Sequence, residues 1–437
     1  MWPGSAELLY LPRRQCGCNV TRPQSCDRPP VFLGDEWSII LAMAADPVIT
    51  TAQRRARLGQ RHLLTPGRSA PGSVSGVVEV ADALVALHAT DPASVVLAVL
   101  ARSAADVPTV ERALHDERAL VRMLSMRRTV WVVALDVAPV VQAACTLDVA
   151  AVQRRRLVEH IERAGVIQDG ATWLADVEAS ALQALVKRGE ATAVELVADE
   201  PRLRTQIVVP PDDTPQNMTS RALLVMAADG HIVRGRPLGG WTSTQYRWSP
   251  VSAWWPDGFP ALEPDAARTE LARRWLTAFG PAPVADLKWW TGWTMARTRA
   301  ALAAVGAVPV DLDGVPGVVL PDDIEPVAEP EPWVALLPGL DPTPMGWQER
   351  GWFLGEHKAP LFDRSGNIGP TVWCDGRIVG GWAHRADGTV ALRLLEDIGA
   401  EATAAVHAAA ERLAGRVGGV RVTPRFRTPL ERELVSS

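Results

Sequence analysis

The alternation of hydrophobic and polar residues is most informative between residues 217 and 250. Residues 221–227 are mainly hydrophobic and can form two or three helical turns, which Gly230 can end because glycine readily takes the left-handed conformation of a helix C-cap. Two strand-like segments follow, 231–236 and 241–248, and both contain arginine. This pattern predicts a helix followed by a β-hairpin. Such a unit occurs in winged-helix DNA-binding proteins and also in unrelated α+β enzymes.

The rest of the chain repeats this order of helices and a hairpin. A first unit has predicted helices at 50–64, 77–88, 92–103 and 109–115, then strands at 119–124 and 129–134. A second unit has helices at 152–164, 171–188 and 192–198 before the helix and hairpin described above. A third unit has helices at 265–279, 283–290 and 295–305, then strands at 308–312 and 317–320. Three such units in series indicate a structural repeat with divergent sequence.

The C-terminal part of the chain is β-rich instead. Strand patterns lie between 333 and 395, followed by a predicted helix at 401–412 and a strand at 419–422. The fold class is therefore α+β, with winged-helix units predicted at 46–148, 149–262 and 263–325 and a β-rich domain at 326–437. Residues 1–45 lack periodicity, and we expect them to be a disordered or wrongly annotated extension before a folded protein that begins near Met43.

Composition narrows the class of protein. A hydrophobic fraction of 47% and a charged fraction of 22% are typical of a soluble globular chain, and no apolar run approaches the ~20 residues of a membrane span. The net charge of -5 means that any DNA binding must come from a local basic patch. Five cysteines without histidines at ligand spacing predict a reducing, cytoplasmic setting and no structural metal.

Arginines on the helices and hairpins are the candidates for such a patch. Alternate side chains of a strand share one face, so a hairpin can present several arginines to DNA phosphates. The candidates are Arg127 and Arg128 in the first hairpin turn, Arg154 and Arg155 on helix 152–164, Arg221 on helix 221–227, and Arg234, Arg236, Gln245 and Arg247 on the second hairpin. Arg128 fits a solvated turn residue equally well.

Five motifs carry a resemblance to a known family. They are LVALHATDPAS (84–94), LVRMLSMRRTVWVV (120–133), VRGRPLGGWTSTQYRW (233–248), LLPGLDPTPMGW (336–347) and GPTVWCDGRIVGGW (369–382). With them the chain resembles the winged-helix DNA glycosylases of the AlkZ/YcaQ type over about 50–422. The resemblance implies three tandem winged helices around a C-terminal β-barrel and a basic groove for double-stranded DNA. It also implies hydrolysis of the N-glycosidic bond of alkylated purines without a metal or organic cofactor.

In that family a Gln-aliphatic-Gln or Gln-aliphatic-Asp motif holds the nucleophilic water. The matching positions here are His88, Ala89 and Thr90, so both polar positions differ. His88, with an ordinary pKa near neutrality, can act as a general base, Thr90 can orient a water, and Asp91 can supply negative charge. The alternative is structural: Thr90 or Asp91 caps the helix that begins at Pro92, and His88 packs at a helix end.

Two functions compete at this point. The first is a monofunctional DNA glycosylase acting on alkylated bases, expected to be a cytoplasmic, nucleoid-associated monomer with no cofactor. The second is a noncatalytic DNA-binding protein, such as a regulator or a damage-binding module. A small-molecule-binding protein with winged helices as a scaffold is a more distant third. Replacement of the family's motif by His88 and Thr90 is the feature that separates the first two.

Overall fold

A three-stranded antiparallel sheet is the centre of the N-terminal group of elements. The computed structural model describes residues 46–209 and 212–436. The group comprises α1 (Thr51–Arg61), α2 (Val74–Ala83), β1 (Leu87–His88), α3 (Pro92–Leu100), α4 (Val107–Glu111), the π-helix η1 (Arg112–Asp116), β2 (Leu120–Leu124), the 3-10 turn η2 (Met126–Arg128), β3 (Val130–Ala134), α5 (Ala138–Val141) and the π-helix η3 (Gln142–Thr146). The strand order is β1-β3-β2.

The second group is mostly helical and ends in the hairpin expected from the sequence. Its elements are α6 (Leu147–Arg163), α7 (Gly170–Arg188), α8 (Ala193–Asp199), η4 (Pro201–Arg204), β4 (Gln206–Val209), β5 (Asp212–Asn217), α9 (Thr219–Ala228), β6 (Ile232–Pro237), β7 (Tyr246–Pro250) and η5 (Val251–Ala253). Two hairpins, β4-β5 and β6-β7, form separate two-stranded sheets, of which the first was not foreseen. The helices and the β6-β7 hairpin share their own hydrophobic core around Leu174, Leu223 and Trp248.

The third group agrees closely with the sequence pattern. It consists of α10 (Pro264–Phe279), α11 (Val284–Thr291), α12 (Met295–Ala304), β8 (Val308–Asp311) and β9 (Pro316–Val319). The left-handed Gly292 ends α11, and the Thr294 side chain accepts a hydrogen bond from the Arg297 amide to begin α12. The strands β8 and β9 pair as a hairpin directly after the helices, as predicted.

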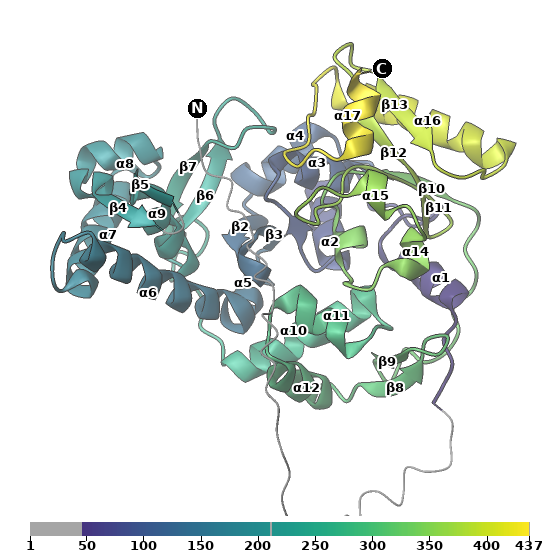
Figure 1. Cartoon of the computed structure of the whole chain (residues 1–437), viewed down its shortest axis with the longest axis horizontal. Helices are drawn as coiled ribbons and strands as arrows, with labels where there is room; N and C mark the ends of the chain where they lie inside the picture. The colour runs from purple at the N-terminus through teal and green to yellow at the C-terminus, as the bar shows by residue number, and fades with distance from the viewer. Residues whose placement is uncertain (1–45, 210–211, 437) are drawn as a thin grey trace, which may run out of the picture. The chain divides into compact units, whose positions relative to one another are not determined.

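The C-terminal group is built on a four-stranded antiparallel sheet. Its elements are β10 (Val334–Leu337), α13 (Pro342–Met345), α14 (Gly351–Leu354), α15 (Lys358–Leu361), β11 (Thr371–Cys374), β12 (Arg377–His384), β13 (Val390–Leu394), α16 (Ala400–Val417) and α17 (Pro429–Ser436). The order is β10-β11-β12-β13 with neighbours in sequence paired (Figure 1). The two outer strands do not pair with each other, so the sheet within the described residues is open and the expected closed barrel is not formed.

Two further expectations about elements were wrong. The predicted helix at 77–88 ends at Ala83, because Val85 takes a positive φ of 62° and turns the chain onto β3, with which Leu87 and His88 pair. The predicted strand at 419–422 is an irregular segment that starts with the left-handed Gly418 and Gly419. The expectation for residues 1–45, including a start near Met43, lies outside the described residues.

One continuous hydrophobic core joins the first, third and C-terminal groups. Its large members include Trp131, Trp275, Phe279 and Trp373, all nearly inaccessible to solvent. A buried ion pair crosses this core, since Arg102 after α3 donates to both carboxylate oxygens of Asp341 at 2.9 and 2.6 Å. Residues 48–437 form one compact unit, and the finer division into domains remains a prediction. Within the described residues, no helix combines the length and the apolarity needed to cross a bilayer.

Candidate functional site

His88 lies in the short strand β1, directly opposite Trp131 of β3. Its ring centroid is 4.8 Å from that of Trp131, its side chain is only 4% exposed, and its Nδ1 atom is buried without a hydrogen-bond partner. Burial, and next the positive charge of Arg127, lower the pKa of His88 to about 3. The expectation of a near-neutral general base was therefore wrong: at pH 7 the imidazole is uncharged and only weakly basic.

Thr90 and Asp91 follow His88 and differ sharply in how their oxygens are used. The Thr90 hydroxyl is buried without a hydrogen-bond partner among the described residues. Asp91 caps α3, with Oδ1 accepting from the Ala93 amide at 3.1 Å and Oδ2 from the Arg425 amide at 2.9 Å. Burial raises the pKa of Asp91. Both carboxylate oxygens are thus occupied by backbone donors, so Asp91 has the structural role of a helix cap and not that of a free catalytic carboxylate.

Arg127 connects His88 to α11. It lies in the turn η2 with a positive φ of 54°, and its guanidinium carbon is 3.9 Å from the ring centroid of Trp289. The guanidinium of Arg350 lies 5.1 Å from the same ring. Burial lowers the pKa of Arg127 to about 10, and the nearby charge of Arg350 contributes. Arg127 is therefore a half-buried neighbour of His88 whose guanidinium stacks on Trp289, and its expected phosphate contact stays a prediction.

A polar cluster that the sequence did not reveal lies beside this arrangement. Asp286 of α11 is 0% exposed, and its Oδ1 accepts from the amides of Gln348 and Glu349 while Oδ2 has no partner among the described residues. Burial raises the pKa of Asp286 to about 6. Arg54 of α1, whose guanidinium stacks on Trp352 at 4.1 Å, is also buried with unpaired N–H groups. Asp286 has no sequence signal, because a single aspartate in a helix is ordinarily exposed.

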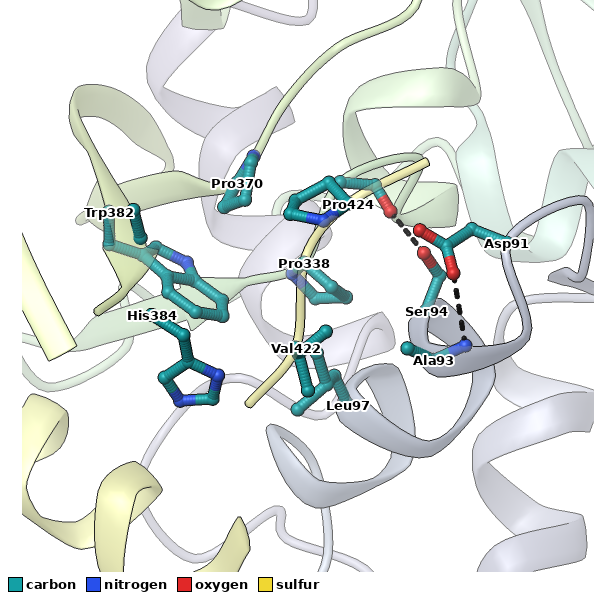
Figure 2. A pocket seen from close by; sticks show the side chains of 12 residues that line it. Asp91, Ala93, Ser94, Leu97, Pro338, Pro370, Trp382, His384, Val422 and Pro424 are labelled. Carbon is teal, nitrogen blue, oxygen red and sulfur yellow. Dashed lines mark hydrogen bonds between the residues drawn. The ribbon is translucent and has the colours of Figure 1, made fainter. Parts of the chain in front are cut away.

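A small cavity opens on the far side of Asp91. Figure 2 shows Asp91 and Ser94 facing Pro338, Trp382 and His384 across it. Its volume of about 10 Å³ is sufficient for one water molecule. His88 and Thr90 do not line it, and it is too small for a nucleobase.

Several of the expected DNA-binding arginines have carboxylate partners instead. Arg154 bridges Glu178 and Asp229, Arg236 pairs with Asp116, and Arg247 lies 3.4 and 3.7 Å from Glu190 and Glu195. These contacts neutralise the positive charge that a phosphate would need. These three arginines are therefore not free in the structure, since their partners lie on other elements and cannot be seen in a linear pattern. Their role in DNA binding stays a prediction.

Other expected arginines remain unpaired. In the described part of the chain no carboxylate pairs with Arg128, Arg155 or Arg221, and Arg128 and Arg155 are exposed. Beyond the effect of burial, the charge of Arg156 lowers the pKa of Arg128, and the charge of Arg128 lowers that of Arg221. Residues of η2, α6 and α9 thus form a basic surface. Gln245 is exposed in the β6-β7 hairpin, whereas Arg234 stacks on Tyr246 and Trp248.

Comparison with known proteins identifies the family. A model of the AlkZ-like DNA glycosylases matches residues 81–416. The chain belongs to the AlkZ-like DNA glycosylase family. Its fold is similar to that of Streptomyces sahachiroi DNA glycosylase AlkZ, with a TM-score of 0.64 and 21% sequence identity over 87% of this chain and 100% of that chain. No match was found among curated proteins.

Within this AlkZ-like chain, His88 and Thr90 lie inside the matched region. His88 lies on β1, the edge strand of the N-terminal sheet, Thr90 follows it two residues later, and Arg127 is near enough to lower the pKa of His88. Only His88 and Thr90 of these three were proposed for chemistry. Over the described residues, no group of three His, Cys, Asp or Glu side chains is arranged to bind a metal ion.

Proposed function

We propose that this protein is a monofunctional DNA glycosylase that releases alkylated bases from duplex DNA, with His88 and Thr90 holding the water that attacks the sugar. The observation that supports this is the pair of unpartnered buried atoms, His88 Nδ1 and Thr90 Oγ1. The two residues are separated only by Ala89 at the end of β1, and in this proposal one water contacts both atoms. Buried polar atoms normally have a partner, and two orphans at the family's catalytic positions point to a bound water.

The uncharged state of His88 fits this role. The glutamines of the family's motif orient water through neutral groups, and an imidazole with a pKa of about 3 is equally neutral at pH 7. In the reaction the C1′–N bond breaks, its electron pair leaves with the base, and the water oxygen forms a bond to C1′. His88 and Thr90 hold that oxygen in line with C1′. The water's proton is lost to solvent after the C1′–O bond has formed, because neutral His88 is too weak a base to remove it first.

DNA binding in this proposal rests on the unpaired arginines. Arg128, Arg155 and Arg221 contact backbone phosphates, and the β6-β7 hairpin acts as the wing that carries Gln245 to a groove edge. The winged-helix interpretation is supported by the third group, in which α10, α11 and α12 are followed directly by the β8-β9 hairpin. A wing and a basic helix surface are the parts that such domains place against duplex DNA.

The test is base excision by the full-length protein on a duplex with one N7-methylguanine. Heating in alkali converts each abasic site into a strand break that is quantified on a gel. We expect excision by the wild type, a loss of about a hundredfold or more in His88→Ala, and substantial activity in His88→Gln, which restores the family's residue. The matched control is His407→Ala. His407 is an exposed histidine on α16, and its variant should bind and excise like the wild type.

Two results would direct the assignment elsewhere. Excision that is unchanged in both His88→Ala and Thr90→Ala would remove these residues from the mechanism. Duplex binding without excision by the wild type would favour the second candidate, a noncatalytic DNA-binding module. This candidate is a specific alternative because both polar positions of the family's motif differ in this chain.

A further inference from the structure

Three arginines from distant parts of the chain surround one tyrosine of the β6-β7 hairpin. The guanidinium carbon of Arg122, on β2, lies 4.6 Å from the ring centroid of Tyr246, and that of Arg234, on β6, lies 5.9 Å from it. Arg425 precedes α17, and its positive charge acts on both Arg234 and Tyr246. Arg425 itself is exposed, whereas Arg122 is buried.

Several hydrogen-bonding atoms of this cluster have no partner among the described residues. Arg122 is only 6% exposed, and its Nε and Nη1 atoms are buried without a hydrogen-bond partner in the described structure. The Tyr246 hydroxyl and the Nδ1 atom of His115 are also buried and unpartnered. Burial lowers the pKa of Arg122 and, with the charges of Arg122 and Arg236, lowers that of His115 to about 3.

The nearest carboxylates do not neutralise these arginines. Asp116 is paired with Arg236, and both oxygens of Asp91 accept from backbone amides, one of them that of Arg425. No ion pair joins Arg122, Arg234 or Arg425 to any carboxylate of the described residues. A buried guanidinium without a counter-ion is costly, and such a group is ordinarily found where a ligand supplies the missing charge.

We propose that Arg122, Arg234 and Arg425, together with the Tyr246 hydroxyl, bind a single phosphate group of the DNA backbone. A phosphate has several acceptor oxygens and negative charge, which match the planar N–H donors of arginine and one hydroxyl donor. The exposed Gln245 precedes Tyr246 on the same hairpin and Arg425 is exposed as well, so a strand of DNA that follows this hairpin reaches the cluster beside these two residues. This inference rests on the DNA binding in the proposed function but not on base excision.

Occupancy of this site would tie three elements to the DNA at one phosphate. Arg122 belongs to β2, Arg234 to β6, and Arg425 to the segment whose amide holds Asp91 at the N-terminus of α3. The segment with His88 and Thr90 leads directly into Asp91. A phosphate bound here therefore fixes the position of the DNA strand relative to the candidate water-binding residues, without any contact to the reacting base.

The test compares Arg122→Met with Tyr246→Phe and with Arg102→Met, all in the full-length protein. Methionine preserves an unbranched apolar chain at position 122 but removes the charge. Arg102 is the matched control, since it is also buried but is paired with Asp341. Melting temperature without ligand is measured for each variant. The affinity for an undamaged duplex is measured by fluorescence anisotropy over a series of NaCl concentrations.

We expect Arg122→Met to melt no lower than the wild type, while Arg102→Met melts clearly lower. We also expect Arg122→Met to bind the duplex about tenfold more weakly and to reduce the slope of log Kd against log salt by about one, the signature of one lost phosphate contact. Tyr246→Phe, which removes only the hydroxyl, should weaken binding by a smaller factor.

Three results would overturn the inference. The first is a large drop in the melting temperature of Arg122→Met, which would mean that its charge is compensated inside the fold. The second is an unchanged salt slope. The third is a melting temperature that inorganic phosphate raises in the wild type but not in Arg122→Met, combined with unchanged duplex binding, which would assign the site to a free phosphate. Because the duplex is undamaged, absence of base excision affects none of these readouts.

Discussion

Base excision by this protein should be insensitive to the protonation of His88 between pH 8 and pH 5. A histidine with the ordinary pKa of 6.5 would be about 97% protonated at pH 5, and the fraction of neutral imidazole would fall about thirtyfold. His88 has a pKa of about 3, so only about 1% of it is protonated at pH 5 and nearly all of it stays neutral. The cause is burial against Trp131 and beside Arg127.

The assay is single-turnover release of N7-methylguanine at saturating protein, measured from pH 8 to pH 5 and corrected for spontaneous depurination. Folding must be followed by circular dichroism over the same range. The folded pKa of His88 is depressed, so the unfolded chain binds a proton first. The stability gained from the neutral ring is complete above pH 6.5 and is lost toward pH 3, at about 1.4 kcal/mol per pH unit for each such histidine. His62, with a pKa also lowered to about 3, contributes in the same direction.

The reasoning is refuted if the rate of the folded protein falls tenfold or more with a midpoint near pH 6.5 and if His88→Gln abolishes that fall. Such a profile would mean that His88 is solvated when DNA is bound and acts as a general base. A flat profile in both the wild type and His88→Gln would agree with a neutral residue that orients water.

Two other predictions concern the buried ion pair of Arg102 and the arginines of the basic surface. Asp341→Asn removes the charge that compensates the fully buried Arg102. We expect this variant to lose about 3–5 kcal/mol of the free energy of unfolding, measured by urea titration. A loss below about 1 kcal/mol would contradict the stabilising role of this ion pair. Arg128→Ala and Arg221→Ala should each lower the slope of log Kd for the duplex against log salt by about one, without changing the melting temperature. Arg188, which pairs with Asp199, is the control, and Arg188→Ala should leave that slope unchanged. Equal slopes for all three variants would exclude the basic surface as the phosphate contact.

The fold was predictable where the chain carries clear breaks. Helices α10 to α12 and the β8-β9 hairpin were placed within a few residues, because Gly280-Pro281 and Gly292 end helices for local steric reasons. The prediction of a helix over 77–88 was wrong at its C-terminal end, because a short apolar run there is compatible with a helix and with a strand. Pairing of Leu87 with Val132 of β3 decided in favour of a strand, and that is a tertiary contact which no local pattern contains.

The candidate residues could be named from the sequence, but their local structure and electrostatics could not be predicted from it. The resemblance singled out His88 and Thr90, whose roles remain a prediction, and it put His88 at the end of a helix although His88 lies in the strand β1. The pKa of His88 depends on Trp131 and Arg127, which approach it only in the fold. The same holds for Arg154, whose partner Asp229 is 75 residues away. Arg122 gave no signal, since in LVRML it resembles an ordinary residue of a half-exposed strand.

The contrast between Arg102 and Arg122 explains how a chain with a net charge of -5 can still bind a polyanion. Both guanidinium groups are buried, but Arg102 has two carboxylate oxygens within 2.9 Å and Arg122 has none. Surface arginines such as Arg236 are neutralised by neighbouring acids, so they add little to the local field. In the proposed phosphate site the uncompensated charge of Arg122 lies in low-dielectric surroundings, where it interacts more strongly with a phosphate than a charge on an open surface does. Affinity in such a protein depends on which arginines lack partners and not on how many arginines the sequence contains.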